Sequence, residues 1–378
     1  MAAPRPVPGL VLTGGGARAA YQVGVLEALS ELLPGERNPF PVVTGTSAGA
    51  VAAGVMGAKA YDWRQAVADL AQVWRNFRVD QVFLADVPHM LGAGVHWMAA
   101  LMSAGLLVSP PHSMLDNSPL RELLASHIDW RGVRTGIDGG HLRGVALSAT
   151  SYGTGQSVAF YDAVPGISDW TRAHHLGLRT SLGLDHLMAS TAIPMVFPAV
   201  RLGDGWYGDG SMRQLNPLSP AIHLGADRLL IVGVGAFRGA GITQGANGMP
   251  AAGQIMGFML DTLFTDQIQA DLEQLQRLNE LARLAPEEVR SLHKVQTLMI
   301  TPSEDPRTIA ARHIAAMPAG LRALLRVTGA QNSGGGQLAS YLMFEAAFTR
   351  DLMQLGYRDA MRMADPLVDF IRGVPRGM

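Results

Sequence analysis

The sequence predicts an α/β fold with a mostly parallel central sheet, helices on its faces and further helices toward the C-terminus. Two observations support this fold class. Over the first 60 residues, short apolar runs typical of buried strands alternate with segments that repeat apolar residues at helical spacing. Strand-like runs then return between helical stretches further along the chain. Strands that alternate with helices usually pair in parallel and place those helices on the faces of the sheet.

The first elements follow one another closely. The run "GLVLT" predicts a strand, and the helix after it places Val23, Leu26, Leu29 and Leu33 at helical spacing. The break "PGERNPF" ends that helix, and "PVVTGT" predicts a second strand. The segment "SAGAVAAGVMGAKA" predicts a second helix, whose small residues allow close packing.

The later elements mix helices and strands. Residues 62–128 are predicted to be mostly helical, "HLRGVALSAT" and "QSVAFYD" to be strands, and "SLGLDHLMASTAIP" to be a helix that ends before Pro194. The segment "VFPAVRLGDGWYGDGS" predicts a hairpin with Asp204-Gly205 at its turn. After the strand "DRLLIVGVG" we expect a helix over 251–284, the strand "VQTLMI", and helices over 308–327 and 337–363.

No internal repeat or clear boundary divides the chain. We therefore expect an extended tail over residues 1–9, an α/β core over 10–235, a Gly-rich surface loop over 236–250 and a helical part over 251–378 packed on the core.

Composition excludes several classes of protein. The net charge is −1, lysine occurs only at positions 59 and 294, and the sequence has no basic run, so nucleic acid is not an expected partner. The absence of cysteine excludes disulfides, thiolate catalysis and Cys-based zinc sites. The Pro-rich start lacks the apolar region of a signal peptide, so we expect a cytoplasmic protein.

One apolar segment raises the question of membrane contact. Leu91 to Val108 contains no Asp, Glu, Lys or Arg, and its 18 residues reach the lower limit for a membrane-spanning helix. His96, Ser103 and three glycines weaken that interpretation. A buried helix is the simplest alternative, and an apolar lid or a lipid-facing helix is the third.

The triple glycine after the first strand has two interpretations. Gly14, Gly16 and Ala19 fit the dinucleotide pattern G-x-G-x-x-G/A, which also requires an acidic residue at the end of the next strand. That strand ends instead in Thr46 and Ser47, so the acidic residue that a dinucleotide site requires is missing. The other interpretation is a loop whose N–H groups bind a transient oxyanion.

The pentapeptide "GTSAG" supports the second interpretation. Gly45 and Gly49 flank Ser47 at a strand-to-helix junction, which is the pattern of a nucleophile elbow. Serine at this position could also serve only as a helix cap. The carboxyl ends of neighbouring parallel strands meet at one sheet edge, so we expect Ser47 to lie beside the triple glycine.

A serine nucleophile needs a base. His223, His293 and His313 are histidine candidates, but each lies within a helical pattern rather than in a loop. The run "SLHK" suggests a Ser–Lys pair but lacks partner motifs. Asp209, at the end of the returning strand of the hairpin, can instead place a carboxylate at the sheet edge.

Four ordered segments resemble the patatin-like phospholipases: "GGGARAAYQVGVLEAL", "GTSAGAV", "ASTAIPMVFPAV" and "WYGDGSMRQLNPLSPAIHLGADRLLIVGV". The C-terminal "GGGQLASYLMFEAAFTRDLMQLGYRDA" is similar to bacterial members, so the resemblance covers nearly the whole chain. It implies a three-layer α/β/α fold with added C-terminal helices. It also implies an esterase that cleaves fatty acyl esters and needs neither metal nor cofactor. The low content of charged residues and the apolar segment Leu91–Val108 fit an enzyme that takes its substrate from the surface of a membrane.

The resemblance also implies roles for individual residues. Ser47 and Asp209 match the catalytic dyad, and Gly14, Gly15 and Gly16 match the loop that supplies the oxyanion hole. The supporting positions Arg18, Gly45, Gly49 and Gly210 match as well. Two positions depart from the family pattern: Ala19 replaces a glycine, and Ser211 follows Asp209-Gly210 where glycine or alanine is usual. A lipid-binding protein with an impaired site is therefore the alternative function.

Overall fold

The structure is a computed structural model that describes residues 6–84, 92, 95–96, 99, 102–103, 109, 113–236, 249–284, 295–330 and 336–374. The apolar segment Leu91–Val108 lies for the most part outside these residues, as do most of the predicted Gly-rich loop 236–250 and His293. Within the part that is described, no helix is both long enough and apolar enough to cross a bilayer.

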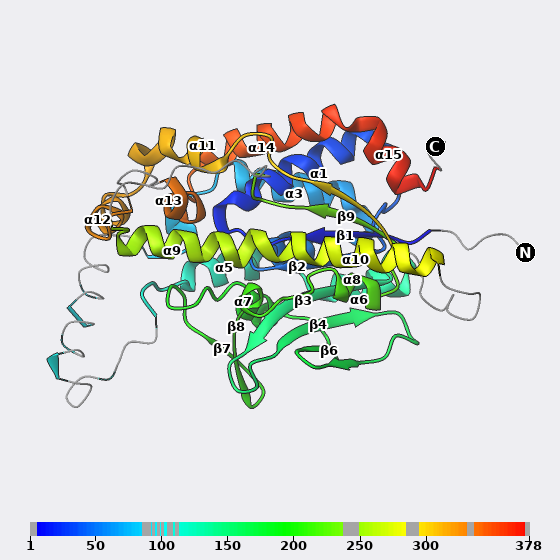
Figure 1. The fold of residues 1–378 in the computed structure, drawn as a ribbon, viewed down its shortest axis with the longest axis horizontal. Coiled ribbons are helices and arrows are strands. Elements are labelled where there is room, and N and C mark those ends of the chain that lie inside the picture. The colour runs from blue at the N-terminus through cyan, green and yellow to red at the C-terminus, as the bar shows by residue number, and fades with distance from the viewer. Residues whose placement is uncertain are drawn as a thin grey trace, which may run out of the picture.

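One ten-stranded sheet forms the centre of the molecule (Figure 1). Its order is β10-β9-β1-β2-β3-β4-β6-β5, and the β7–β8 hairpin also pairs with β3. The five strands from β10 to β3 are parallel, whereas β3 pairs antiparallel with β4 and with β8. The strands are β1 (Pro8–Leu12), β2 (Val42–Thr46), β3 (Gly144–Ser151), β4 (Ser157–Ala163), β5 (Trp170–Arg172), β6 (His175–Arg179), β7 (Val200–Leu202), β8 (Gly205–Asp209), β9 (Arg228–Val232) and β10 (Gln296–Ile300).

Helices connect these strands and extend the C-terminal part. The α-helices are α1 (Ala20–Leu32), α2 (Ala48–Ala58), α3 (Trp63–Arg75), α5 (Ser118–His127), α6 (Arg131–Asp138), α7 (Leu184–Ser190), α8 (Ser219–His223), α9 (Ala252–Asp261), α10 (Gln267–Leu284), α11 (Pro306–His313), α12 (Ala319–Val327), α13 (Gly336–Leu342), α14 (Ala346–Arg362) and α15 (Ala364–Arg372).

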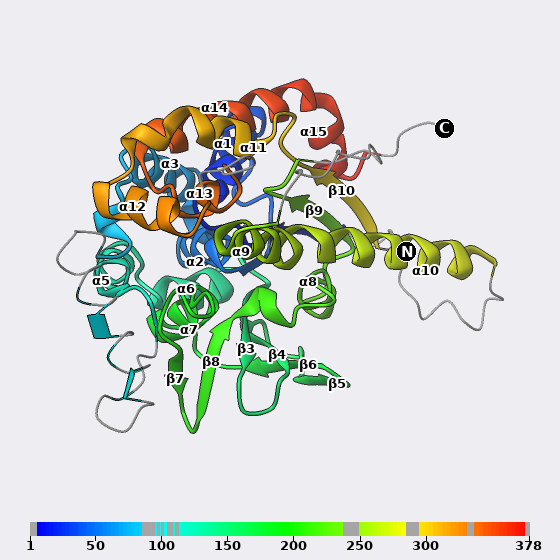
Figure 2. The same cartoon turned by 60° about the vertical axis from the view of Figure 1, so that its left-hand side comes forward.

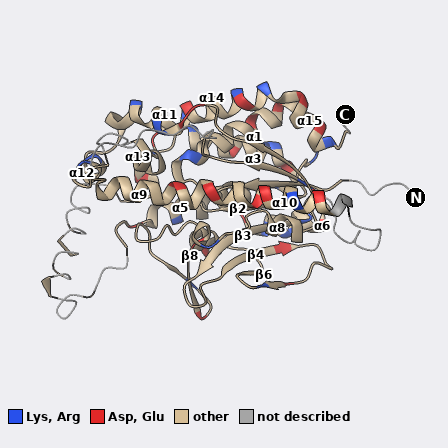
Figure 3. Ribbon diagram, viewed as in Figure 1, with Lys and Arg blue, Asp and Glu red and all other residues tan. Residues whose placement is uncertain are grey.

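Both faces of the sheet are covered. Alternate residues of β1 point to opposite sides, so Leu10 and Leu12 join the core beneath α1, α2 and α3, while Val11 joins a second core with α8 and α10. Figure 2 shows α11 to α15 on the same side of the sheet as α1 and α3. Charged residues of both signs occur along α14, whereas α9 carries a single one, Asp261, at its end (Figure 3).

The register brings three loops together at one sheet edge. Leu12 pairs with Gly45, so the residues after β1 and β2 lie side by side. Along β3, Ser148 pairs with Thr46 of β2, and the next residue, Ala149, pairs with Asp209 of β8. Since β4 occupies the other side of β3, β2 and β8 approach each other along one side, and their carboxyl ends meet.

These observations confirm the predicted α/β class and its mostly parallel sheet. Several details differ from the prediction. The helices expected over 308–327 and 337–363 are each divided in two, into α11 and α12 and into α13 and α14. The hairpin turn is Gly203-Asp204 rather than Asp204-Gly205, because Leu202 pairs with Gly205 and the positive φ falls on Gly203. The helix expected over 251–284 is divided into α9 and α10 by a wider turn, Thr262–Asp266.

Candidate active site

Ser47 occupies a strained turn between β2 and α2. Its φ of 54° and ψ of −128° lie in a sparsely populated region that costs of the order of 1–3 kcal/mol. The backbone on either side of this turn is packed too closely for a side chain at Gly45 or Gly49. A Cβ at Gly45 would lie 2.4 Å from the Gly49 carbonyl oxygen, and one at Gly49 would lie 2.3 Å from that of Leu12. Local sterics thus explain why the predicted positions Gly45 and Gly49 need glycine.

Asp209 is buried at the end of β8, with a side chain that is only partly hydrogen-bonded. Its Oδ1 accepts from the backbone N–H of Ser211 at 2.9 Å. Its Oδ2 is buried and has no hydrogen-bond partner among the described residues. Gly210 allows this approach, because a Cβ there would lie 2.3 Å from the Ser148 carbonyl oxygen. A buried oxygen without a partner can accept a proton from a neighbouring group.

The environment of Asp209 makes it a better base than an ordinary aspartate. Burial raises its pKa to about 6, while hydrogen bonds from Ser47 and Ser211 oppose the rise. The Ser47 hydroxyl is thus close enough to lower the pKa of this carboxyl, although Oδ2 has no partner of ordinary hydrogen-bond geometry among the described residues. Catalytic hydrogen bonds are often loose before substrate binds.

The C-terminal end of α7 and the two residues after it form hydrogen bonds with both Ser47 and Asp209. The backbone N–H of Ser47 donates to Oγ of Ser190 at 3.0 Å, and that hydroxyl donates to the Ser148 carbonyl at 2.6 Å. Two residues further on, the carbonyl of Ala192 accepts from the backbone N–H of Asp209 at 2.9 Å. The segment 190–192 therefore links the nucleophile candidate to the base candidate. Sequence reasoning did not identify Ser190 as a site residue.

The three glycines of the first loop are tightly enclosed. A Cβ would lie 2.6 Å from the Phe264 ring at Gly14, 2.4 Å from Val234 at Gly15 and 2.4 Å from the Tyr341 carbonyl oxygen at Gly16. Within the described chain, none of their three N–H groups has a hydrogen-bond acceptor. Gly16 lines the same cavity as Ser47, whereas Gly14 lines a neighbouring one.

Arg18 fastens this loop to the C-terminal part. Its guanidinium is buried, pairs with Asp261 at 2.8 Å, donates to Oγ of Ser340 at 2.8 Å and lies 3.8 Å from the centre of the Tyr341 ring. Arg18 is absent from the lining of the Ser47 cavity. Its contacts thus join the glycine loop to the C-terminal helices without reaching the cavity that contains Ser47.

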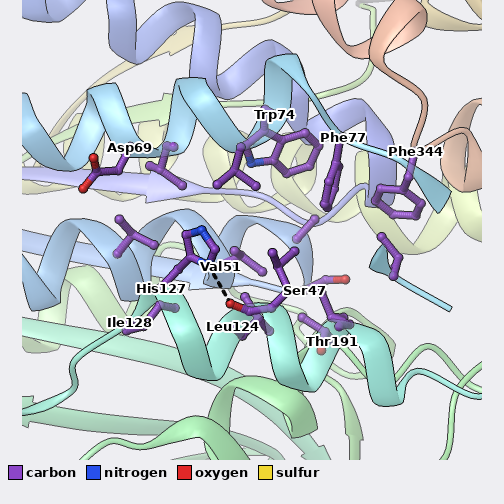
Figure 4. Close-up of a pocket in the computed structure, with 18 of the residues that line it drawn as sticks. Ser47, Val51, Asp69, Trp74, Phe77, Leu124, His127, Ile128, Thr191 and Phe344 are labelled. Atoms are coloured by element: carbon purple, nitrogen blue, oxygen red, sulfur yellow. Dashed lines mark hydrogen bonds between the residues drawn. The ribbon is translucent and has the colours of Figure 1, made fainter. Parts of the chain in front are cut away.

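A narrow apolar cavity of about 70 Å³ extends from Ser47 (Figure 4). Its walls come from α2, α3 and α5, and Phe77, Thr191 and Phe344 lie at the Ser47 end. Asp69 and His127 are labelled at the other end, away from Ser47. An acyl chain attached at Ser47 would find an apolar path there.

The two positions that depart from the family pattern are accommodated. Ala19 is buried in the core below the loop. Ser211 donates its backbone N–H to Asp209, and its hydroxyl also lowers the pKa of that carboxyl. Neither residue blocks the cavity that contains Ser47.

The histidine candidates lie elsewhere. His223 stacks on Trp170, with ring centres 4.5 Å apart, and the His313 ring contacts Asp351 at 2.7 Å. His127 does line the cavity, but its Nδ1 contacts the Leu123 carbonyl at 2.9 Å. Among the described residues, no group of three His, Asp or Glu side chains comes together as a metal site would require.

Comparison with solved structures finds several matches of low sequence identity, two of which are VipD and a cytosolic phospholipase A2. VipD from Legionella pneumophila is 13% identical, with 96% of this chain and 67% of VipD covered and a TM-score of 0.34. Human GIVD cytosolic phospholipase A2, bound to methyl gamma-linolenyl fluorophosphonate and terbium chloride, is 12% identical, with a TM-score of 0.45. The alignment covers 97% of this chain and 59% of the human chain, so this protein spans about three fifths of that length.

Comparison with curated proteins finds no match. The sequence profile of one family, described as patatin-like phospholipase, matches residues 10–222, which is more than half of the chain. The matched range contains the triple glycine, Ser47, the α7 segment and Asp209. The chain therefore belongs to the patatin-like phospholipases.

Proposed function

We propose that this protein is a serine acyl hydrolase that cleaves fatty acyl esters through a Ser47–Asp209 dyad. The observation that carries the proposal is the pairing of two buried groups beside an apolar cavity: a strained serine at its end and a carboxylate whose Oδ2 lacks a partner among the described residues. Family membership supports a lipid ester as the substrate class.

In the first half-reaction, Asp209 Oδ2 takes the proton of the Ser47 hydroxyl as Oγ attacks the ester carbonyl. We infer that N–H groups of the Gly14–Gly16 loop donate to the resulting oxyanion, and one such donor is typically worth about 2.7–4 kcal/mol. When the tetrahedral intermediate collapses, the bond to the alcohol breaks and the alcohol leaves with the proton from Asp209. Ser47 then carries the acyl group.

In the second half-reaction, a water molecule gives a proton to Asp209 and attacks the acyl carbonyl. The bond to Ser47 breaks, the fatty acid is released, and Ser47 recovers its proton from Asp209. The carboxylate is suited to both steps because burial raises its pKa to about 6, closer to neutral pH than that of an ordinary aspartate.

Steady-state hydrolysis of a p-nitrophenyl acyl ester tests the dyad. We expect Ser47→Ala and Asp209→Asn each to reduce kcat by about a thousandfold or more, because each removes a member of one proton-transfer unit. Asp204→Asn in the exposed hairpin turn and Ser168→Ala in an exposed loop are matched controls that should retain wild-type rates.

The alternative function, a lipid-binding protein with an impaired site, predicts a different result. It requires acyl esters to bind to the wild-type protein without turnover. Hydrolysis that persists in Ser47→Ala or in Asp209→Asn would reject the dyad, provided that the far-ultraviolet circular dichroism of the variant matches that of wild type.

A further inference from the structure

The cavity beside Ser47 has apolar walls along its length. Ala48, Val51 and Val55 lie at helical spacing on one side of α2 and line it together. The facing walls consist of apolar side chains of α3 and α5, namely Leu70, Val73, Trp74, Leu120, Leu123 and Leu124. A straight hydrocarbon chain fits such a lining, because it has no polar atom to leave unsatisfied.

Polar groups mark the end of the cavity away from Ser47. Asp69 lines it there, contacts Lys59 just beyond the end of α2, and accepts from Nε2 of Gln65 at 2.8 Å. His127, the last residue of α5, lines the same end. The side chains of Lys59 and Asp69 are each 29% exposed, so this pair meets solvent. A methyl group pushed against it would displace water from charged groups.

The length of the apolar part can be measured along two helices. Eight residues separate Ser47 from Val55, which is about 12 Å at 1.5 Å per residue. Along α5, seven residues separate Leu120 from His127, or about 10 Å. With carbon–carbon bonds of about 1.5 Å at tetrahedral angles, an extended chain advances about 1.25 Å per carbon. The apolar path therefore accommodates about eight to ten carbons.

We propose that this cavity acts as a ruler that selects medium-chain acyl esters, with an optimum of about eight to ten carbons. Val55 lies at its deep end, and the Lys59–Asp69 pair closes it. The proposal rests on the hydrolase function proposed above. It adds the class of substrate that the enzyme prefers. Longer acyl chains are disfavoured because their last methylenes would contact the charged Lys59–Asp69 pair. Within the apolar part, each further methylene should raise kcat/KM about fourfold, equivalent to about 0.8 kcal/mol per buried CH₂.

The test is a series of p-nitrophenyl esters from four to sixteen carbons, assayed below their micelle concentrations. For the wild type we expect kcat/KM to rise to about ten carbons and to fall beyond that length. Val55→Phe fills the deep part of the cavity and should move the optimum to about six to eight carbons. Ala68→Phe, on the exposed side of α3, is the matched control and should leave the profile unchanged.

A second variant should lengthen the acyl chain that the enzyme prefers. The double substitution Lys59→Met and Asp69→Leu removes the half-exposed charges and should extend the optimum to about fourteen carbons or more. If melting curves show that Val55→Phe is unfolded, Val73→Phe, from the facing helix, carries the same expectation of a shorter optimum.

The possible results separate the two proposals. A wild-type protein that cleaves no ester of any length contradicts the hydrolase function itself. A protein that cleaves esters in a Ser47-dependent manner, but prefers sixteen carbons or keeps one profile in all folded variants, contradicts only the ruler.

Discussion

At the scale of single residues, the proposed site depends on the carboxylate of Asp209, which is buried where its ionised form is disfavoured. Asp209 is 1% exposed, and one of its oxygens has no hydrogen-bond partner among the described residues. Burial removes water from the charged form and raises the pKa to about 6. The same desolvation that makes this group a usable base should also reduce the stability of the fold.

The first prediction concerns the dependence of activity on pH. Only the ionised form of Asp209 can accept a proton, so kcat/KM should fall as the pH decreases through about 6, approaching a tenfold loss per pH unit. An ordinary aspartate would remain active to about pH 4. The measurement is kcat/KM for a soluble ester between pH 4.5 and 8. Full activity at pH 4.5 would show that Asp209 is not the base.

The second prediction concerns stability. Because its pKa is raised on folding, Asp209 binds its proton more tightly in the folded protein, so its contribution to the free energy of unfolding falls as the pH rises from about 4 to about 6. Asp209→Asn removes this penalty. We expect the variant to be more stable than wild type by about 1–3 kcal/mol at pH 7.5, at 1.36 kcal/mol per pKa unit.

Urea denaturation at pH 7.5 and pH 4 measures this difference. The gain should shrink toward zero at pH 4, where the wild-type carboxyl is protonated in the folded state and close to half-protonated in the unfolded state. A variant that is less stable than wild type at pH 7.5 would contradict the desolvation argument.

At the scale of elements, α7 orders the site without supplying a nucleophile or a base. The Ser190 hydroxyl accepts the Ser47 N–H at 3.0 Å, and the Ala192 carbonyl accepts the Asp209 N–H at 2.9 Å. The elbow is strained at Ser47, so it needs fixed partners to hold this conformation. The alignment of the proposed dyad therefore depends on this short helix and on the two residues that follow it.

The third prediction follows for Ser190→Ala. Loss of its hydroxyl leaves the buried Ser47 N–H without an acceptor, which costs about 1–3 kcal/mol. We expect kcat to fall at least about tenfold, which corresponds to a barrier raised by about 1.4 kcal/mol, with KM changed less than about twofold. Steady-state kinetics and melting curves on the same samples provide the measurement.

Ser303→Ala is the matched control for Ser190. The Ser303 hydroxyl donates to Asp359 at 2.6 Å, away from the Ser47 cavity, so its loss should lower stability and leave kcat unchanged. A Ser190→Ala variant that behaves like this control, with reduced stability and full kcat, would show that Ser190 has a structural role only.

Local sequence was enough to predict the elements that carry the site. The strands, the elbow "GTSAG" and the glycine loop each have a signature within a few neighbouring residues, and strand–helix alternation predicts parallel pairing, although not the observed strand order. Ser190 could not be found in this way, because its role depends on a bond to a residue 143 positions away. The cavity walls from α3 and α5 have the ordinary pattern of a buried helix face, which does not distinguish core from cavity.

At the scale of the whole molecule, the C-terminal helices support the first loop of the chain. Arg18 reaches Asp261 of α9 and Ser340 and Tyr341 of α13, more than 240 residues away in sequence. Asp261 also accepts from Nε2 of Gln337 at 2.6 Å. Resemblance alone identified Arg18 as a supporting residue, because nothing near it in sequence indicates a partner so far along the chain.

The fourth prediction tests this connection. Asp261→Leu leaves the buried Arg18 guanidinium without its carboxylate, and breaking a buried pair in this way costs about 3–5 kcal/mol. We expect the free energy of unfolding to fall by that amount, and kcat to fall as the oxyanion loop loses its support. Urea denaturation and ester hydrolysis measure the two effects.

The matched control is the exposed ion pair between Asp129 and Arg131, which lie 2.9 Å apart. Asp129→Leu should change stability by less than about 1 kcal/mol, because water screens exposed pairs. Equal effects of the two substitutions would contradict a special role of the Arg18–Asp261 pair.

The most direct test of the dyad is covalent labelling with an alkyl fluorophosphonate, followed by intact-mass and peptide mass spectrometry. The Ser47 oxygen would form a bond to phosphorus as fluoride leaves and Asp209 takes the proton. We expect one adduct per chain, located on Ser47, none on Ser47→Ala, and labelling of Asp209→Asn that is about a hundredfold slower or more. An adduct on a different residue, or labelling of Asp209→Asn at the wild-type rate, would contradict the dyad.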